Sequence, residues 1–144
     1  MDYPNFSNGA YYSYNLIHIK IKKSNNKLQG GFKMQLVKNI EFSRALNLKD
    51  LVKYEDGQIV SRTLTQLPAV TITLFALHQG EGISTHTTPG DAMVQMLDGE
   101  GEITIGDNVH VVKAGETIIM PADIPHSLEA KENFKMLLTV IKRG

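Results

Sequence analysis

Residues 80–99 read GEGISTHTTPGDAMVQMLDG, and residues 115–126 read GETIIMPADIPH. In both stretches, glycine and proline separate short runs that contain β-branched and other apolar residues. This pattern is typical of turns that connect strands rather than of long helices. Both stretches therefore predict short β-strands, and each carries one histidine, His86 or His126, close to a proline.

The sequence on either side continues the same alternation of short apolar runs and turn residues. We expect strands near Gln58–Leu64, Val70–His78, Ile83–His86, Ala92–Leu97, Glu102–Ile105, Asn108–Val112, Thr117–Met120, His126–Glu129 and Phe134–Ile141. Phe42–Val52 is the best helix candidate, since its apolar residues form a stripe at helical spacing and Ser43 can cap it. Many short strands at regular spacing indicate an all-β sandwich or a closed barrel.

The order of glycine, histidine and proline resembles the two motifs of the cupin superfamily, G-x5-H-x-H-x3,4-E-x6-G and G-x5-P-x-G-x2-H-x3-N. The matching residues are Gly80, His86 and Gly99 in the first motif and Gly115, Pro121 and His126 in the second. Asp123 and Ala130 replace the glycine and the asparagine of the second motif. The chain thus resembles a small single-domain cupin, or monocupin, with a degenerate first motif. The resemblance implies a jelly-roll-like double-stranded β-helix, to which the short N-terminal helix would be added.

The resemblance also implies a reduced metal site. In the family, two histidines and a glutamate of the first motif and one histidine of the second bind a divalent metal, often manganese, iron, nickel or zinc. Here only His86 and His126 remain, because Thr88 and Ala92 stand at the other two ligand positions. Neutral imidazoles are good ligands for these metals. Two of them alone hold a metal only weakly unless water or other groups complete its coordination.

A pocket beside the two histidines would draw on Thr88, Ala92, Gln95, Met96 and Met120. Strand alternation places Ala92 and Met96 on one face and Gln95 on the other, unless a bulge reverses the pattern. Gln95 is therefore either a buried amide with partners or a pocket residue. The methionines either fill the core or line an apolar pocket next to the histidines.

The first 33 residues differ from the rest of the chain. They contain five lysines and one aspartate, whereas residues 34–144 contain 10 basic and 14 acidic residues. Codons for Gln29-Gly30-Gly31 can contain AGGAGG, a bacterial ribosome-binding sequence, shortly before Met34. Our hypothesis is that residues 1–33 form an arm that is translated from upstream sequence or is poorly ordered. Residues 34–144 are then the cupin domain, with its motifs at 80–99 and 115–130.

Composition narrows the possible partners and the compartment. The chain has 144 residues, no cysteine and a formal net charge of +0, so disulfides, thiolate metal sites and general nucleic-acid binding are disfavoured. We see neither a signal peptide nor an apolar run of the roughly 18 residues that a membrane-spanning helix needs. We therefore expect a cytoplasmic protein that binds neither nucleic acid nor membranes.

These observations favour a small-molecule-binding monocupin, with or without a weakly bound divalent metal, whose ligand is small and either apolar or anionic. The alternative is a metal-dependent cupin enzyme of the dioxygenase, isomerase or decarboxylase type. A metal-free isomerase or epimerase with a histidine base is a third possibility, so enzymatic activity stays open. We also expect a homodimer, because short strands leave sheet edges to be covered and Gln58–Leu64 can add to such an edge.

Overall fold

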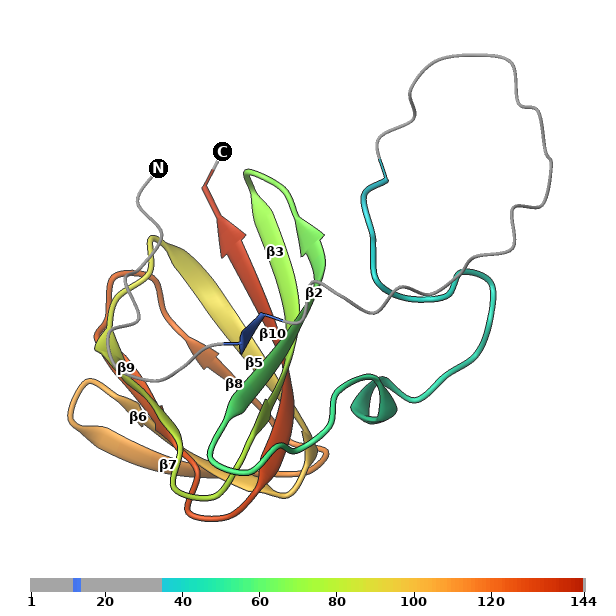
Figure 1. Ribbon diagram of the computed structural model, residues 1–144. Helices are drawn as coiled ribbons and strands as arrows, with labels where there is room; N and C mark the ends of the chain where they lie inside the picture. Colours follow the sequence, from blue (N-terminus) through green and yellow to red (C-terminus); the bar gives the residue numbers. More distant parts are fainter. Residues whose placement is uncertain (1–11, 14–34, 144) are drawn as a thin grey trace, which may run out of the picture.

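The computed structural model describes residues 12–13 and 35–143, and almost all of the regular structure there is β (Figure 1). The elements are β1 (Tyr12–Ser13), η1 (Leu48–Leu51), β2 (Ile59–Gln66), β3 (Val70–Leu77), β4 (Gly82–His86), β5 (Gly90–Asp98), β6 (Glu100–Ile105), β7 (Asn108–Lys113), β8 (Thr117–Met120), β9 (His126–Glu129) and β10 (Phe134–Lys142). Each strand expected from the sequence is present to within a few residues. In the described part of the chain, no helix is both long and apolar enough to cross a membrane.

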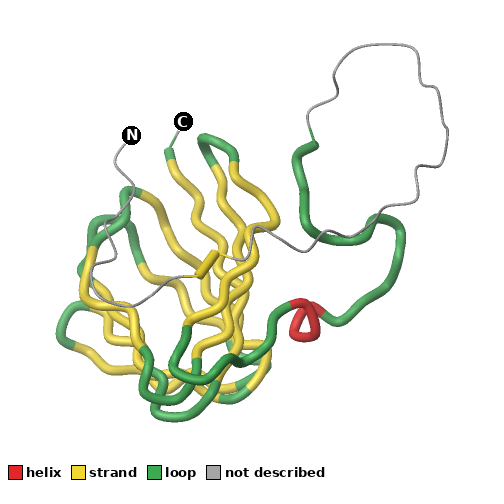
Figure 2. The backbone as a smooth tube through the Cα atoms, viewed as in Figure 1, coloured by secondary structure: helices red, strands yellow, loops and turns green. Residues whose placement is uncertain are grey.

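Two sheets face each other and curl into a barrel, as the strand traces in Figure 2 show. The six-stranded sheet has the order β1-β2-β3-β10-β5-β8, and the four-stranded sheet has the order β4-β9-β6-β7. The pairings are antiparallel except for the short parallel contact of β1 with β2. The all-β barrel predicted from the turn pattern is confirmed.

The barrel interior is filled by alternate side chains of the facing strands. Along β5, Ala92, Val94 and Met96 are buried, while the residues between them are partly exposed. They belong to one apolar cluster with Ile59, Leu77, Ile83, Ile103, Val112, Met120, Leu128, Ala130, Phe134, Met136 and Val140. Full burial of one larger apolar side chain contributes about 1.5–3 kcal/mol. This cluster therefore fixes which face of each strand points inward.

A second apolar cluster lies on the outer face of the six-stranded sheet, under the segment that contains η1. Its buried members are Val52, Val60, Leu64, Leu74 and Ala76. The hydroxyl of Tyr54 donates to Asp98 Oδ2 at 2.6 Å, and Lys135 Nζ lies 4.9 Å from the centroid of the Tyr54 ring. These contacts attach the segment before β2 to the ends of β5 and β10.

The expected short helix is present, but it is restricted to the 3-10 turn Leu48–Leu51. Asn47, rather than Ser43, caps it: the Asn47 side chain accepts from the amide of Lys49 at 3.4 Å. Ser43 has φ 58°, a left-handed conformation that cannot belong to a right-handed helix. The apolar residues Leu48 and Leu51 pack on the second cluster, and this packing accounts for part of the stripe read in the sequence.

The proposed N-terminal arm lies outside the described residues, with the exception of Tyr12 and Ser13, whose backbone pairs with Val60 and Ser61 of β2. The segment Gln58–Leu64 is largely β2, which pairs with β3 along its length and with β1 only at Val60 and Ser61. Ile59 and Leu64 are buried in the two clusters of the same chain. Among the described residues β1 pairs only with Val60 and Ser61, so the addition of this segment to a sheet edge of a second copy stays a prediction.

Candidate functional site

His86 and His126 come from neighbouring strands of the four-stranded sheet. Along the β4–β9 ladder, Ile83 pairs with Leu128, and the next pair is His86 with His126. The interval is three residues on β4 and two on β9, which is the signature of a β-bulge. Without the bulge, Ile83 and His86 would point to opposite faces, because alternate residues of a strand change sides. The bulge therefore brings His86 to the face that also carries His126.

The two imidazole rings are in contact. Their centroids lie 4.5 Å apart, and their planes are inclined by 66° in an edge-to-face arrangement. Nδ1 of His86 lies 2.8 Å from the carbonyl oxygen of Ser84, and Nδ1 of His126 lies 2.9 Å from that of Ile124. Because a carbonyl oxygen only accepts hydrogen bonds, each Nδ1 must carry the proton. In each neutral ring, the nitrogen that carries the lone pair is therefore Nε2.

The environment of His126 favours its neutral form. Its side chain is only 2% exposed, whereas His86 is half-buried. Burial lowers the pKa of His126, the carbonyl of Ile124 partly opposes that effect, and the nearby His86 lowers the pKa further. At neutral pH the buried ring is thus an uncharged hydrogen-bonding group, and it is the more constrained member of the pair.

Two connected loops form the rim of the barrel beside these rings. One joins β4 to β5 and the other joins β8 to β9. The amide of Asp123 donates to the carbonyl of Thr88 at 2.8 Å, and the amide of Ala122 donates to Asp91 Oδ1 at 2.8 Å. Ile124 is 41% exposed on the second loop. The rim is thus held by backbone amides and presents at least one apolar side chain.

Only some of the predicted pocket residues lie at this end of the barrel. Ala92 and Met120 are paired across β5 and β8, are both buried, and stand next to the two rim loops. Thr88 is part of the rim, but its hydroxyl donates to the carbonyl of Gly90 at 2.8 Å. Its oxygen is therefore committed to the turn in this structure.

Gln95 and Met96 are not brought to the histidines. Gln95 pairs with Leu137 of β10, which packs on the outer cluster, so its side chain lies on the opposite face from Ala92. Met96 faces inward but lies four residues further along β5, where a side chain on Gly101 would meet the Met96 methyl group and Phe134. Met96 is thus core filler near the other end of the barrel, which corrects its place in the predicted pocket.

The side chains present do not complete a metal site of the family type. Across residues 12–13 and 35–143, no three histidine, aspartate or glutamate groups come together in a way that could hold a metal ion. His86 and His126 supply two imidazoles, Ala92 supplies no ligand, and the Thr88 hydroxyl is bonded within its own turn. The residues therefore do not fit a four-ligand centre.

The sequence did not reveal two features of the site, the bulge in β4 and the rim around Ile124. The carbonyls that orient the rings belong to Ser84 and Ile124, each two residues before its histidine. Every residue has a carbonyl, so side-chain patterns carry no signal for this role. A bulge likewise follows from the pairing of two strands rather than from the composition of one.

Comparisons with known proteins agree with this architecture. Residues 73–142 match the family model described as the cupin domain. A comparison with curated proteins found no match. The crystal structure of a conserved protein of unknown function from Streptococcus pyogenes matches this one with a TM-score of 0.75 and 47% sequence identity. The match covers 77% of this chain and 97% of that one.

Two further solved structures carry family names. A cupin superfamily protein from Desulfitobacterium hafniense is 31% identical, with a TM-score of 0.72 and coverage of 74% of this chain and 98% of that one. A cupin 2 conserved barrel domain protein from Leptotrichia buccalis is 44% identical, with a TM-score of 0.66. That match covers 67% of this chain and 47% of the other.

Proposed function

Because the chain belongs to the cupin superfamily, we propose that its barrel binds a small molecule at the end where His86 and His126 meet. The observation that carries this proposal is the contact of the two rings at 4.5 Å, one of them only 2% exposed. Burying a polar group costs free energy unless it is hydrogen-bonded. A pair of imidazoles at the end of an apolar barrel matches the usual composition of ligand sites, mostly apolar with a few polar groups.

The tautomers define the chemistry of the ligand. With both Nδ1 atoms bonded to carbonyls, each neutral ring presents a lone pair on Nε2. Such a pair accepts hydrogen bonds from hydroxyl, amide or ammonium groups and repels a carboxylate. The neighbouring Ala92 and Met120 favour an apolar body. We therefore propose a small ligand with an apolar body and one or two hydrogen-bond donors, rather than an anion.

Weak binding of a divalent metal is a second property of the same pair that we propose. Histidines that bind metals commonly donate one ring N–H to a carbonyl and use the other nitrogen as the ligand. His86 and His126 both have the first half of this arrangement. Two imidazoles leave most coordination positions to water, so the affinity should be low. A metal-dependent dioxygenase, isomerase or decarboxylase would need more ligands than these residues offer, and we derive no reaction step from them.

The proposal can be tested by NMR of the imidazole nitrogens. We would record long-range ¹H–¹⁵N spectra while titrating small phenols, primary amides and benzoates, each as a separate probe. Phenols or amides should shift the Nε2 signals of His86 and His126, and benzoates should do so much less. A His110→Gln variant assigns the signal of an exposed histidine on β7, which should not move. If none of the probes shifts the paired rings, or if the shifts occur elsewhere, the proposed site is wrong.

A further inference from the structure

The inner face of the six-stranded sheet changes from apolar to polar between β5 and β2. Residues that pair directly across an antiparallel ladder lie on the same face of the sheet. Thr73 pairs with Leu138, and Leu138 pairs with Val94, which is fully buried in the barrel. Thr63 pairs with Thr73 and therefore also points inward. Thr73 and Thr63 thus continue, on β3 and β2, the inward row that Val94 begins on β5.

A second inward row of the same kind lies nearer the rim. Ala92 pairs with Val140, and Val140 pairs with Thr71 near the start of β3. The inward residues of β5 and β10 are again apolar, whereas the inward residue of β3 carries a hydroxyl. We call Thr63, Thr71 and Thr73 the hydroxyl wall. Because Ala92 stands next to the rim loops, the wall lies at the end of the barrel where the two histidines meet.

The hydroxyl wall is accessible although it faces inward. Thr63, Thr71 and Thr73 are each partly exposed, whereas Ala92 and Val94 of the same rows are buried. Within the part of the chain that the structure describes, the three threonine hydroxyls form no hydrogen bond with protein. Each hydroxyl has one donor and two acceptor lone pairs, so all three can bond to a molecule in the barrel.

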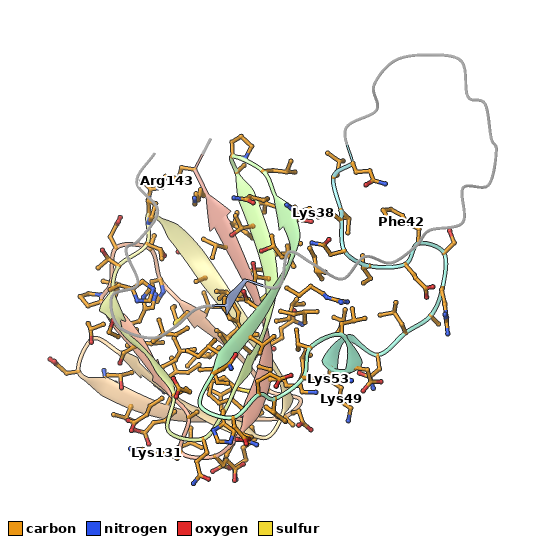
Figure 3. All side chains as sticks on the ribbon, viewed as in Figure 1. Lys38, Phe42, Lys49, Lys53, Lys131 and Arg143 are labelled. Carbon is orange, nitrogen blue, oxygen red and sulfur yellow. The ribbon has the colours of Figure 1, made fainter. Side chains whose placement is uncertain are left out.

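We propose that the hydroxyl wall is the second side of the ligand site and donates hydrogen bonds to an acceptor oxygen of the ligand. This inference rests on the proposed function, in which the Nε2 atoms of His86 and His126 accept hydrogen bonds. The histidines belong to the four-stranded sheet and the wall to the six-stranded sheet, whose strands β2 and β3 lie across the barrel from β9 (Figure 1). Side chains of the two sheets point toward each other across the barrel (Figure 3). Packed sheets are about 10 Å apart, so one small molecule can contact both.

Three features of the site define the class of ligand. The imidazoles accept a hydrogen bond from a donor at one end of the molecule, and the hydroxyl wall donates to an oxygen at the other end. Ala92, Val94 and Leu138 supply an apolar surface beside the wall. The class that satisfies all three is a neutral compound with an apolar body, a hydroxyl at one end and a carbonyl at the other. A ligand without the carbonyl would leave the hydroxyl wall without a partner.

Two phenols that differ at one end test the wall. Para-hydroxyacetophenone carries a carbonyl opposite its hydroxyl, and para-ethylphenol has nearly the same shape without that acceptor. Both should shift the Nε2 signals of His86 and His126 in ¹H–¹⁵N spectra of the full chain. The ketone should bind at least about tenfold more tightly, as one or two added hydrogen bonds allow. Because the carbonyl also makes the phenol a stronger donor, variants of the wall must show where the preference arises.

Threonine-to-valine variants remove the hydroxyls at nearly constant shape, and valine is favourable in strands. Thr63→Val, Thr71→Val and Thr73→Val should each lower the preference for the ketone. The triple variant should abolish the preference while it binds para-ethylphenol as the wild type does. Thr139→Val is the matched control and should keep the full preference, because Thr139 pairs with Ile72 on the outer face of the sheet.

The outcomes separate this inference from the proposed function. If neither probe shifts the paired rings of the wild-type protein, the proposed site is wrong, and so is the role of the hydroxyl wall. If both probes bind but the triple variant keeps the preference, the site stands and the wall does not bond to the ligand. An equal loss of affinity for both probes would mean that the threonines only shape the end of the barrel, which also overturns the inference.

Discussion

The imidazole of His126 is held edge-to-face against that of His86, because the bulged ladder of β4 and β9 pairs these two residues directly. Two rings whose centroids are 4.5 Å apart cannot both become cationic without mutual repulsion. Burial also disfavours the charged form of His126, because the buried cation would lack hydration. Protonation of His126 should therefore destabilise the end of the barrel where the two rings meet.

The first prediction concerns pH and stability. The pKa of His126 is lowered in the folded protein, whereas the unfolded chain binds this proton near the ordinary value of 6.5. The contribution of His126 to stability should be complete above pH 6.5 and should decrease as the pH falls from there towards the lowered pKa. One group changes the free energy of unfolding by at most about 1.4 kcal/mol per pH unit. Urea unfolding at a series of pH values measures this slope.

Two variants separate this effect from general acid sensitivity. His126→Gln removes the titrating ring and should flatten the slope between pH 6.5 and the lowered pKa. His110→Gln, the same substitution at an exposed position of β7, is the matched control for replacing a histidine. If the His126→Gln protein kept the full slope, other groups would be responsible for the pH dependence.

The second prediction concerns the missing ligands. Thr88→His together with Ala92→Glu should raise the affinity for Ni²⁺ or Zn²⁺ by at least about tenfold, since a carboxylate and a third imidazole would join the pair. Without metal, the same protein should be less stable than wild type, because a carboxylate would replace the buried methyl group of Ala92. Calorimetric titration, with circular dichroism to confirm folding, measures both effects.

Gln95→Glu is the matched control for that experiment. It places a carboxylate on the same strand, three residues from Ala92, but on the outer face of the sheet. Combined with Thr88→His, it should leave the metal affinity well below that of the Ala92→Glu combination. Equal affinities for the two combinations would mean that the faces of β5 have been wrongly assigned.

Most of the fold could be predicted because turn residues and alternating strands are local signals. The helix was predicted too long because its apolar stripe could equally serve an extended segment packed on a sheet, as Leu48 and Leu51 do. The approach of His86 to His126 was expected from motif positions. The bulge and the two ring-orienting carbonyls depend on pairing between β4 and β9, which no single stretch of sequence encodes. The position of Met96 could not be predicted, because strand alternation shows which face of β5 a residue occupies but not which end of the barrel it lies near.

The third prediction concerns the attachment of the segment before β2. Burial, the hydrogen bond to Asp98 and the negative charges of Asp98 and Glu132 raise the pKa of Tyr54 well above its usual value, so its hydroxyl remains a donor. Tyr54→Phe should lower the free energy of unfolding by about 1 kcal/mol. In a double-mutant cycle with Asp98→Ala, the coupling should account for most of this loss. A cycle with the exposed Asp107→Ala should give none, and a similar coupling there would contradict the assignment.

The last prediction concerns two turn residues, Gly99 and Asp123, that both have a positive φ. Gly99 has φ 68°, and a Cβ there would press against the carbonyl oxygen of Asn133, so Gly99→Ala should cost at least about 1–2 kcal/mol of unfolding free energy. Asp123 has φ 64°, although the resemblance places a glycine at this position. Asp123→Gly should therefore stabilise the protein, by up to about 1 kcal/mol, because glycine adopts this conformation without steric strain. Urea midpoints of the two variants should move in opposite directions from wild type. A shift in the same direction would mean that one of the two turns does not have the backbone conformation described.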